Sequence, residues 1–350
     1  MRFGAFDQND LSGRVSTAVQ YEERLQLAEL YEKSGFYCYH MSEHHGTPLS
    51  TTPSPSVFLA AMSQRTKTLR FGPLVYLLPA YNPLRLAEEI SMLDNLSNGR
   101  FEFGVGRGAS PHEMGYLGVS SEDMQPMYHE AEKILHDGLI HGVLNHKGTY
   151  WSYDNVELSI RPVQRPRPAM WVAMGGNPDS AVWPARYQAN IVVGAPAAKA
   201  RPVFQRYIEE AKSVPDSDLT SVCMGLNRFI IVGESDETAE DLGHRAWGVF
   251  YSRFIKLWAR HGGTPGNRLP ESFSQLLESG FAVAGSARKV RETLASQIEE
   301  SGANFLSGTF VFGDMSLQES SGSIQRFALD VMPALSVIGE AAHERLLKAA

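Results

Sequence analysis

Cysteine is nearly absent from this 350-residue sequence, which contains only Cys38 and Cys223. The two lie far apart, and neither belongs to a C-x-x-C pair. This spacing argues against a disulfide framework and against a cysteine-rich metal site. A chain with so few thiols fits a reducing compartment, so we expect a cytoplasmic location.

Clusters of basic residues and long apolar runs are missing as well. The net charge is −7 and no run of lysine and arginine stands out, so we expect no nucleic-acid partner. No apolar stretch approaches the ~20 residues that a membrane-spanning helix needs. The first ten residues, MRFGAFDQND, turn polar too early for the apolar region of a signal peptide. We therefore expect no association with a membrane.

What is present is the composition of an ordinary globular protein, 43% hydrophobic and 20% charged. Short apolar runs alternate with longer amphipathic stretches, which gives eight strand–helix pairs in order without a break in composition. Eight such units in one domain predict a closed (β/α)₈ barrel, a TIM barrel with loop insertions. A Rossmann-type domain with an appended region is the alternative.

Two stretches interrupt this alternation. An aromatic, proline-rich stretch at about 140–165 predicts a hairpin or loop insertion. A second at about 244–280 is partly helical and ends in the Gly/Pro-rich HGGTPGNRLP. We expect one domain over 1–350 that includes both insertions.

Several element boundaries follow from the same pattern. After the predicted strand 101–106, the next helix is expected to start near residue 122. Helix 286–302 is expected directly after the second insertion, and the closing helix is expected to end near residue 337.

Catalytic groups of a barrel lie just after the carboxyl ends of its strands. The predicted strand 36–41 runs into Glu43-His44-His45. Residues 40–44 also match the zinc pattern H-x-x-E-H, but that site requires a helix, and a glycine and a proline follow too closely for one. A rim histidine beside a carboxylate can act as a base or donate to an oxyanion. Histidines that only cap the strand are the alternative.

Glycines mark two neighbouring strand ends. Gly72-Pro73 interrupts the strand predicted at 68–78, which indicates a bulge or a simple kink at a barrel corner. Gly104-x-Gly106-x-x-Ala109 matches the dinucleotide fingerprint only weakly, because no helix opens directly after it. We favour a glycine-lined rim where a flat ligand approaches the backbone, with Arg107 binding an anion or forming a structural ion pair.

The predicted strand 169–174 is followed by a helix start. Gly175 and Gly176 leave backbone N–H groups accessible, Asn177 can cap the helix and Pro178 suits its first position. This arrangement suits a phosphate. An ordinary capped turn is the alternative, and Asp179 would compete for the same helix dipole.

Combined over residues 40–108, the motifs E-H-H, LP…NPLR, AEE…LD.LS.GR and G.GRG stand in register. WVAMGGNPDS and the C-terminal SGANFLSGTFVFGDM…FALDVMPAL extend the pattern more loosely. Together they resemble the bacterial-luciferase-like flavin monooxygenases over nearly the whole chain. The resemblance implies a (β/α)₈ barrel, which agrees with the strand–helix count.

The resemblance also implies an activity. Members of that family bind reduced FMN supplied by a separate NAD(P)H:flavin reductase and react it with O₂ to a flavin hydroperoxide. They then oxygenate an aldehyde, ketone or other small organic substrate. A homodimer is plausible from the family. A deazaflavin-dependent dehydrogenase or reductase on the same fold, and a non-catalytic flavin-binding partner subunit, are the competing hypotheses.

The same resemblance assigns residues. His44 matches the active-site acid/base, with Glu43 as its neighbour, and Leu74–Val75 matches a non-proline cis peptide beneath the flavin ring. Arg107 matches the phosphate-side arginine, and the Gly175–Ser180 loop matches the second phosphate-binding element. The expected cofactor-binding residues are Leu74, Val75, Gly106, Arg107, Met174, Gly175, Gly176, Asn177 and Ser180, and no metal is expected.

Two positions depart from the luciferase catalytic subunit. Gly106 replaces a cysteine, which predicts more open space beside the ring, and Gln125 replaces a second phosphate-binding arginine. We expect the substrate pocket to be lined by segments 109–120, 140–160 and 244–280, with 261–280 as a mobile lid.

Overall fold

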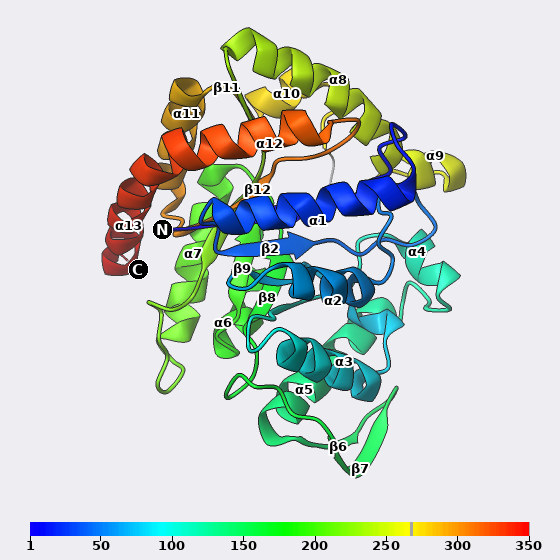
Figure 1. Ribbon diagram of the computed structural model, residues 1–350. Coiled ribbons are helices and arrows are strands. Elements are labelled where there is room, and N and C mark those ends of the chain that lie inside the picture. The colour runs from blue at the N-terminus through cyan, green and yellow to red at the C-terminus, as the bar shows by residue number, and fades with distance from the viewer. Residues whose placement is uncertain (267–268, 350) are drawn as a thin grey trace.

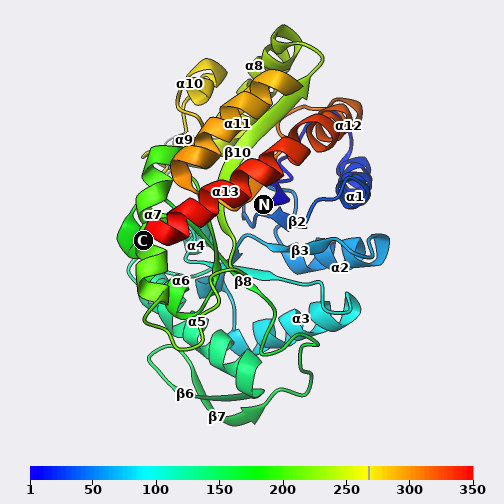
Figure 2. The same ribbon diagram turned by 90° about the vertical axis from the view of Figure 1, so that its left-hand side faces the viewer.

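The protein is a barrel of parallel strands surrounded by helices (Figures 1 and 2). The computed structural model describes residues 1–266 and 269–349. The strands of the main sheet are β1 (Arg2–Asp7), β2 (Cys38–Met41), β3 (Arg70–Pro73), β4 (Tyr76–Leu77), β5 (Phe103–Gly106), β8 (Met170–Met174), β9 (Asn190–Val193), β10 (Met224–Gly233), β11 (Ala282–Ser286) and β12 (Phe305–Thr309).

The helices lie outside the strands, and α4 and α9 lie together at one end of the barrel (Figure 1). They are α1 (Thr17–Lys33), α2 (Pro55–Arg65), α3 (Pro83–Leu96), α4 (Pro111–Tyr116), α5 (Met124–His141), α6 (Val182–Arg186), α7 (Ala197–Ala211), α8 (Asp236–Phe254), α9 (Lys256–His261), α10 (Phe273–Glu278), α11 (Ala287–Ser301), α12 (Leu317–Arg326) and α13 (Met332–Ala349). Short turns η1 (Leu78–Ala80) and η2 (Pro178–Ala181) are 3₁₀-helical, and η3 (Phe327–Val331) is π-helical.

The order of hydrogen-bonded strands confirms the predicted barrel. Neighbours follow the path β3-β2-β1-β12-β10-β9-β8-β5-β4, and β11 adds to β10 beside this path. β3 and β4 stand at the two ends of the path but follow each other in the chain, so its nine strands fill eight positions. A parallel bridge also joins Phe71 of β3 to Phe101, which lies two residues before β5.

Sequence features account for these elements. β10 is buried at all but two of its positions, as a parallel strand covered on both faces requires. Asn82 caps α3 by accepting a hydrogen bond from the Arg85 N–H, as its position predicts. Inside the barrel, the Phe305 ring fills the space that Gly4 and Gly225 leave, because a Cβ atom there would lie 2.6 and 2.5 Å from it.

Four boundaries differ from the sequence predictions. The predicted strand 68–78 is split into β3 and β4, and β11 precedes the helix that begins near residue 286. The helix α4 was not predicted because Pro111 and Gly115 suggested a loop, yet Ser110 caps it and proline is tolerated in a first turn. The closing helix continues to Ala349 because the π-helical turn η3 joins α12 to α13.

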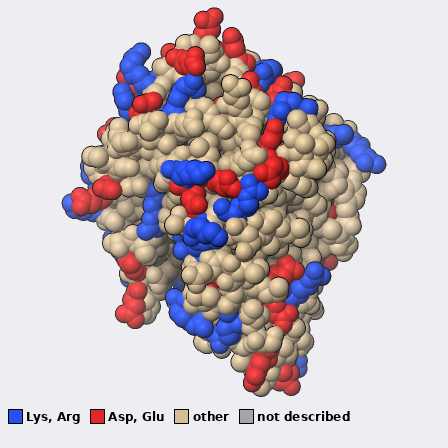
Figure 3. Space-filling model, in the orientation of Figure 1, with Lys and Arg blue, Asp and Glu red and all other residues tan. Residues whose placement is uncertain are grey.

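The first insertion is the predicted hairpin, formed by β6 (Val143–Lys147) and β7 (Ser152–Glu157). None of the helices described in residues 1–266 and 269–349 is long and apolar enough to cross a membrane. On the face in Figure 3, acidic and basic side chains are interspersed rather than gathered by sign. Arg65 of α2, for example, pairs with Glu22 and Glu29 of α1.

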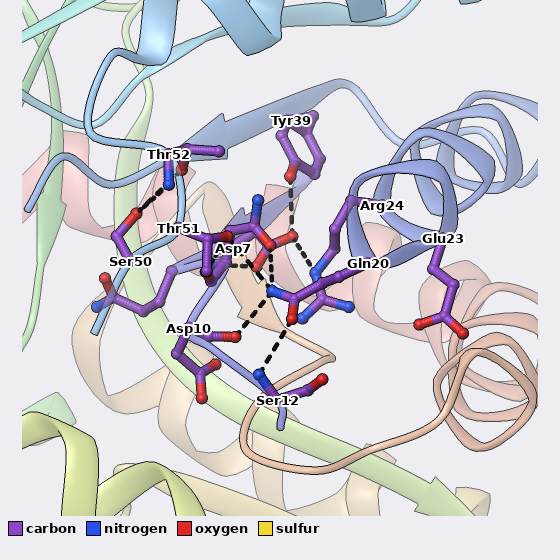
Figure 4. Close-up of polar contacts among 12 residues, drawn as sticks. Asp7, Asp10, Ser12, Gln20, Glu23, Arg24, Tyr39, Ser50, Thr51 and Thr52 are labelled. Carbon is purple, nitrogen blue, oxygen red and sulfur yellow. Dashed lines mark hydrogen bonds and ion pairs between the residues drawn. The ribbon is translucent and has the colours of Figure 1, made fainter. Parts of the chain in front are cut away.

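A buried polar cluster fixes the chain that leaves β1 (Figure 4). The Asp7 carboxylate lies 2.9 Å from Arg24 Nε and accepts a 2.8 Å hydrogen bond from the Tyr39 hydroxyl. The Gln20 side chain from α1 donates to the Asn9 side chain and the Asp10 carbonyl and accepts from the Ser12 N–H. This cluster therefore holds the loop after β1 against α1.

Asp10 gives the cluster a testable pH dependence. Burial, opposed by Arg24, raises the pKa of Asp10 from 3.8 to about 7. Because its pKa is raised on folding, its contribution to stability is fully present below pH 3.8 and is lost as the pH rises to about 7. In the wild type, the free energy of unfolding should therefore fall by up to about 4 kcal/mol between these two pH values. In Asp10→Asn this fall should be absent, which urea unfolding across the pH range measures. Parallel pH profiles for the two proteins would contradict this.

Two glycines of α8 offer a matched test of packing. A Cβ atom on Gly243 would lie 2.1 Å from the Phe273 ring of α10, whereas one on Gly248 would meet nothing within 4 Å. Gly243→Ala should lower the free energy of unfolding by about 1–3 kcal/mol through overpacking. Gly248→Ala should raise it by about 0.5–1 kcal/mol, since alanine favours a helix interior. Effects of the same sign in both variants would show that the α8–α10 contact is not formed as described.

Candidate active site

A cavity of about 730 Å³ opens where the barrel strands end. Five of the residues singled out from the sequence line it, and they come from three different strand ends: His44, Leu74, Met174, Gly175 and Gly176. The lining also includes Glu113 and Lys199, which no sequence motif had indicated. The cavity therefore lies where the barrel prediction places catalytic groups.

His44 contacts a carboxylate, but not that of its neighbour Glu43. Its Nδ1 atom lies 3.2 Å from each Glu113 oxygen, and the Glu113 carboxylate also accepts a 2.8 Å hydrogen bond from the His45 N–H. Glu113 is nearly buried in α4, while the His44 side chain keeps 21% of its surface exposed. When Nδ1 donates to Glu113, Nε2 is left as the acceptor, so the imidazole can exchange a proton with a ligand.

Glu43 has different partners from those expected. One of its oxygens lies 2.8 Å from His45 Nε2, and the other accepts hydrogen bonds from the Leu77 N–H and the Tyr81 hydroxyl. Burial raises the pKa of Glu43, and the hydrogen bond with Glu43 raises the pKa of His45. Glu43 thus joins the loop after β2 to the end of β4. Its carboxylate forms no hydrogen bond with the His44 side chain.

The Leu74–Val75 peptide bond is cis, as the family resemblance implies. It separates β3 from β4, and the Leu74 N–H donates a 2.7 Å hydrogen bond to the Met41 carbonyl at the end of β2. Leu74 lines the cavity, whereas Val75 packs against Gly106. The expectation of open space at Gly106 is therefore wrong, because a Cβ atom there would lie 2.3 Å from Val75 Cγ2.

Two cations lie at the strand ends on either side of β8. Arg107 follows β5 and is exposed, and its side chain donates one 3.2 Å hydrogen bond to Gln125. Lys199, in the first turn of α7 after β9, lines the cavity and pairs with no carboxylate of the described residues. Open space adjoins Gly175 between them. Both charges suit a negatively charged group, and of the two cations Lys199 lines the cavity whereas Arg107 does not.

Two local hydrogen bonds hold the loop after β8. Asn177 accepts a hydrogen bond from the Asp179 N–H and so caps the short helix η2, as predicted. The Ser180 hydroxyl donates a 2.6 Å hydrogen bond to the Asn177 carbonyl. Neither of these two side chains lines the cavity, whereas Met174 at the start of the loop does.

The apolar wall comes from two of the three predicted segments. Residues 109–120 and 244–280 contribute to the lining, including Pro265, Gly266 and Leu269 of the predicted lid. The lid prediction also covers Asn267 and Arg268, which lie outside the described residues. No residue of 140–160 lines the cavity, so this part of the prediction is wrong. The hairpin β6–β7 instead extends away from α4 and α9 (Figure 1).

A buried group outside the lining of this cavity contains three potential metal ligands, Cys38, His40 and Glu102. The Glu102 carboxylate already binds the Arg70 guanidinium and accepts hydrogen bonds from Tyr37 and Trp171. Although burial opposes ionisation, the His40 and Arg70 side chains lower the pKa of Glu102 to about 2. The Glu102 carboxylate is therefore ionised, and the Arg70 guanidinium balances its charge.

The helix α4, which positions Glu113, is itself held by α9. The Tyr116 hydroxyl lies 2.5 Å from His261 Nε2, and the His112 ring stacks on His261 with centroids 4.8 Å apart. His112 also meets Trp258, a lining residue, edge to face. The α9 wall and the partner of His44 are thus connected through one aromatic cluster.

Removing one hydroxyl tests this connection. Tyr116→Phe deletes the hydrogen bond to His261, so amide hydrogen exchange in 256–261 should accelerate about fivefold to tenfold, for about 1 kcal/mol lost. Tyr153→Phe is the matched control, because the Tyr153 hydroxyl bonds Asn82 away from α9. Exchange in 256–261 that is unchanged in Tyr116→Phe, or equally raised in both variants, would contradict the connection.

Comparison with known proteins agrees with this geometry. Residues 1–304 match the family model described as luciferase-like monooxygenase. The chain is 41% identical over 320 residues to the uncharacterised protein y4wF of Sinorhizobium fredii (strain NBRC 101917 / NGR234), covering 91% of this chain and 93% of that protein. It is 26% identical to the oxygenase component of a flavin-dependent trigonelline monooxygenase from Acinetobacter baylyi (strain ATCC 33305 / BD413 / ADP1), covering 96% of each.

Solved structures share the fold. The monooxygenase RslO1 of Streptomyces bottropensis superposes with a TM-score of 0.87 at 23% identity, covering 96% of this chain and all of that one. The oxygenating constituent of 3,6-diketocamphane monooxygenase from Pseudomonas putida, in complex with FMN, gives 0.78 at 20% identity, with 95% and 98% covered. An F420-dependent secondary alcohol dehydrogenase gives 0.70 at 19% identity, with the same coverage. With the family model matched over most of its length, this chain belongs to the luciferase-like monooxygenase family.

Proposed function

We propose that the protein is the oxygenase of a two-component system, which uses reduced FMN and O₂, through a flavin hydroperoxide, to oxygenate a small organic substrate. One observation supports this above the others. A single cavity brings the His44–Glu113 pair together with the cis Leu74–Val75 peptide and the glycines after β8. Each of these comes from a different strand end, as an active site on this fold requires.

The residues fit FMN on two grounds. Leu74 and the Gly175–Gly176 backbone give a flat, apolar face for the ring system, and Gly175 has open space beside it. Arg107 and Lys199 offer positive charge for a phosphate, and Lys199 would supply the second charge that Gln125 does not. When bound in reduced form, FMN would supply the electrons that activate O₂.

The chain's own residues would manage protons and water. His44 Nε2 would hold or transfer the proton, while Glu113 fixes the tautomer and stabilises the charged imidazole. Glu43 would act as a positioning residue, because its carboxylate holds β4 next to the cis peptide. The aromatic wall of α8 and α9 would exclude water from the reacting groups.

The partner is proposed from chemistry and similarity. Reduced flavin would come from a separate NAD(P)H:flavin reductase, as the family resemblance implies. The Acinetobacter relative is an oxygenase component, which supports a separate reductase. A cytoplasmic location and a homodimer stay predictions from the sequence.

Rapid mixing with oxygen tests the reaction class. Protein loaded anaerobically with reduced FMN should reoxidise far more slowly than free flavin, with a transient absorbance distinct from oxidised FMN. His44→Ala should bind reduced FMN equally well but release more hydrogen peroxide per O₂ consumed, because proton control is lost. His146→Ala in the β6–β7 hairpin is the control.

The same experiment separates the alternatives. Reoxidation at the free-flavin rate without a transient would contradict a monooxygenase. Hydride transfer from an alcohol to F420 would then support the deazaflavin hypothesis. This hypothesis is motivated by the similar fold of the F420-dependent secondary alcohol dehydrogenase. Flavin binding without either reaction would support a non-catalytic partner subunit.

The phosphate side has its own test. Arg107→Ala and Lys199→Ala should each weaken FMN binding about fivefold to thirtyfold, for 1–2 kcal/mol of charge-assisted hydrogen bonding lost. Riboflavin lacks the phosphate, so its affinity should change by less than about twofold. Lys212→Ala, just past the other end of α7, is the control. Equal weakening of FMN and riboflavin would show that neither cation binds the phosphate.

A further inference from the structure

The residues proposed to bind the flavin leave the other half of the cavity without an assigned ligand. They follow β3, β5, β8 and β9, which occupy consecutive positions around the barrel, whereas β1 and β10 belong to the remaining strands. The lining from these strands and from α8 and α9 is mostly aromatic: Phe6, Phe229, Phe250, Phe254, Leu257 and Trp258. Gln8, after β1, and Asn227 of β10 are its polar members.

This aromatic wall has no charge. The charged or titratable side chains among the described lining residues are His44, Glu113 and Lys199, and none of them belongs to the wall. A carboxylate or an ammonium group placed there would lose its hydration without gaining an oppositely charged partner. Aromatic faces and edges instead favour another ring. The wall therefore selects for an uncharged molecule that contains a ring.

One polar atom on this side lacks a partner. Gln8 lines the cavity two residues after Phe6, and its Oε1 atom is buried without a hydrogen bond to any described residue. Gln20 shows the contrast, because its side-chain amide is fully engaged in the cluster of Figure 4. Buried acceptors are almost always satisfied in folded proteins, so an unpaired one in a side chain that lines a cavity indicates a donor that arrives with a ligand when the amide turns toward it.

We propose that this half of the cavity binds an uncharged, ring-bearing organic molecule, whose single hydroxyl or N–H group donates a hydrogen bond to Gln8 Oε1. The inference rests on the proposed function, since it describes the substrate half of the same site. It assigns specificity to Gln8 and to the wall of α8 and α9, and it excludes carboxylates and other anions as preferred substrates.

Three small probes that differ in one group test the proposal: para-cresol, toluene and para-toluate. Their affinities are measured by isothermal titration calorimetry with the full chain, first without flavin and then with saturating FMN. Para-cresol should bind to the wild-type protein at least about tenfold more tightly than para-toluate, because the carboxylate of para-toluate finds no positively charged partner on this wall.

Gln8→Leu should weaken the binding of para-cresol about fivefold to fifteenfold, which corresponds to the loss of one hydrogen bond. The affinity for toluene should change by less than about twofold. Gln26→Leu removes the same amide from an exposed position on α1 and should change the affinity of neither probe. Gln8→Met serves as the second variant if Gln8→Leu does not fold.

Other outcomes overturn the proposal. They are para-toluate binding as tightly as para-cresol, Gln8→Leu weakening toluene and para-cresol equally or not at all, and none of the three probes binding. Because the flavin-free titrations do not depend on FMN, their failure contradicts this inference alone. Failure of FMN to bind in the second series contradicts the proposed function instead.

Discussion

The contact between His44 and Glu113 is the interaction on which this account depends. It joins the loop after β2 to the short helix α4, and the same carboxylate accepts the His45 N–H. Without it the imidazole would be a mobile, exposed side chain with no fixed tautomer. With it, one ring nitrogen is bound and the other can serve a ligand in the cavity.

The barrel explains why such distant residues meet. Parallel strands direct their carboxyl ends to one rim, so the segments after β2, β3, β5 and β8 surround one cavity. α4 in turn rests on α9 through Tyr116, His112 and His261, so the wall of the cavity and the partner of His44 are parts of one structure. A change in either helix would be felt at the imidazole.

The barrel and the place of the site could be predicted from the sequence, because hydrophobic period and strand ends are local signals. Glu113 could not, since it lies 69 residues from His44 and in a helix of six residues that contains Gly115. One local signal was available: Ser110 and Glu113 form an S-x-x-E pair that often opens a helix. Lys199 belongs to no motif and becomes notable only because the fold brings α7 to the cavity.

A structure of the protein with bound FMN would be the sharpest test of the His44–Glu113 site. We expect the ring system to lie against the Leu74–Val75 peptide, with its reactive edge within about 4 Å of the His44 imidazole or one water away. The phosphate should then lie between Arg107 and Lys199. A flavin bound elsewhere, or one whose reactive edge faces away from His44, would contradict the account.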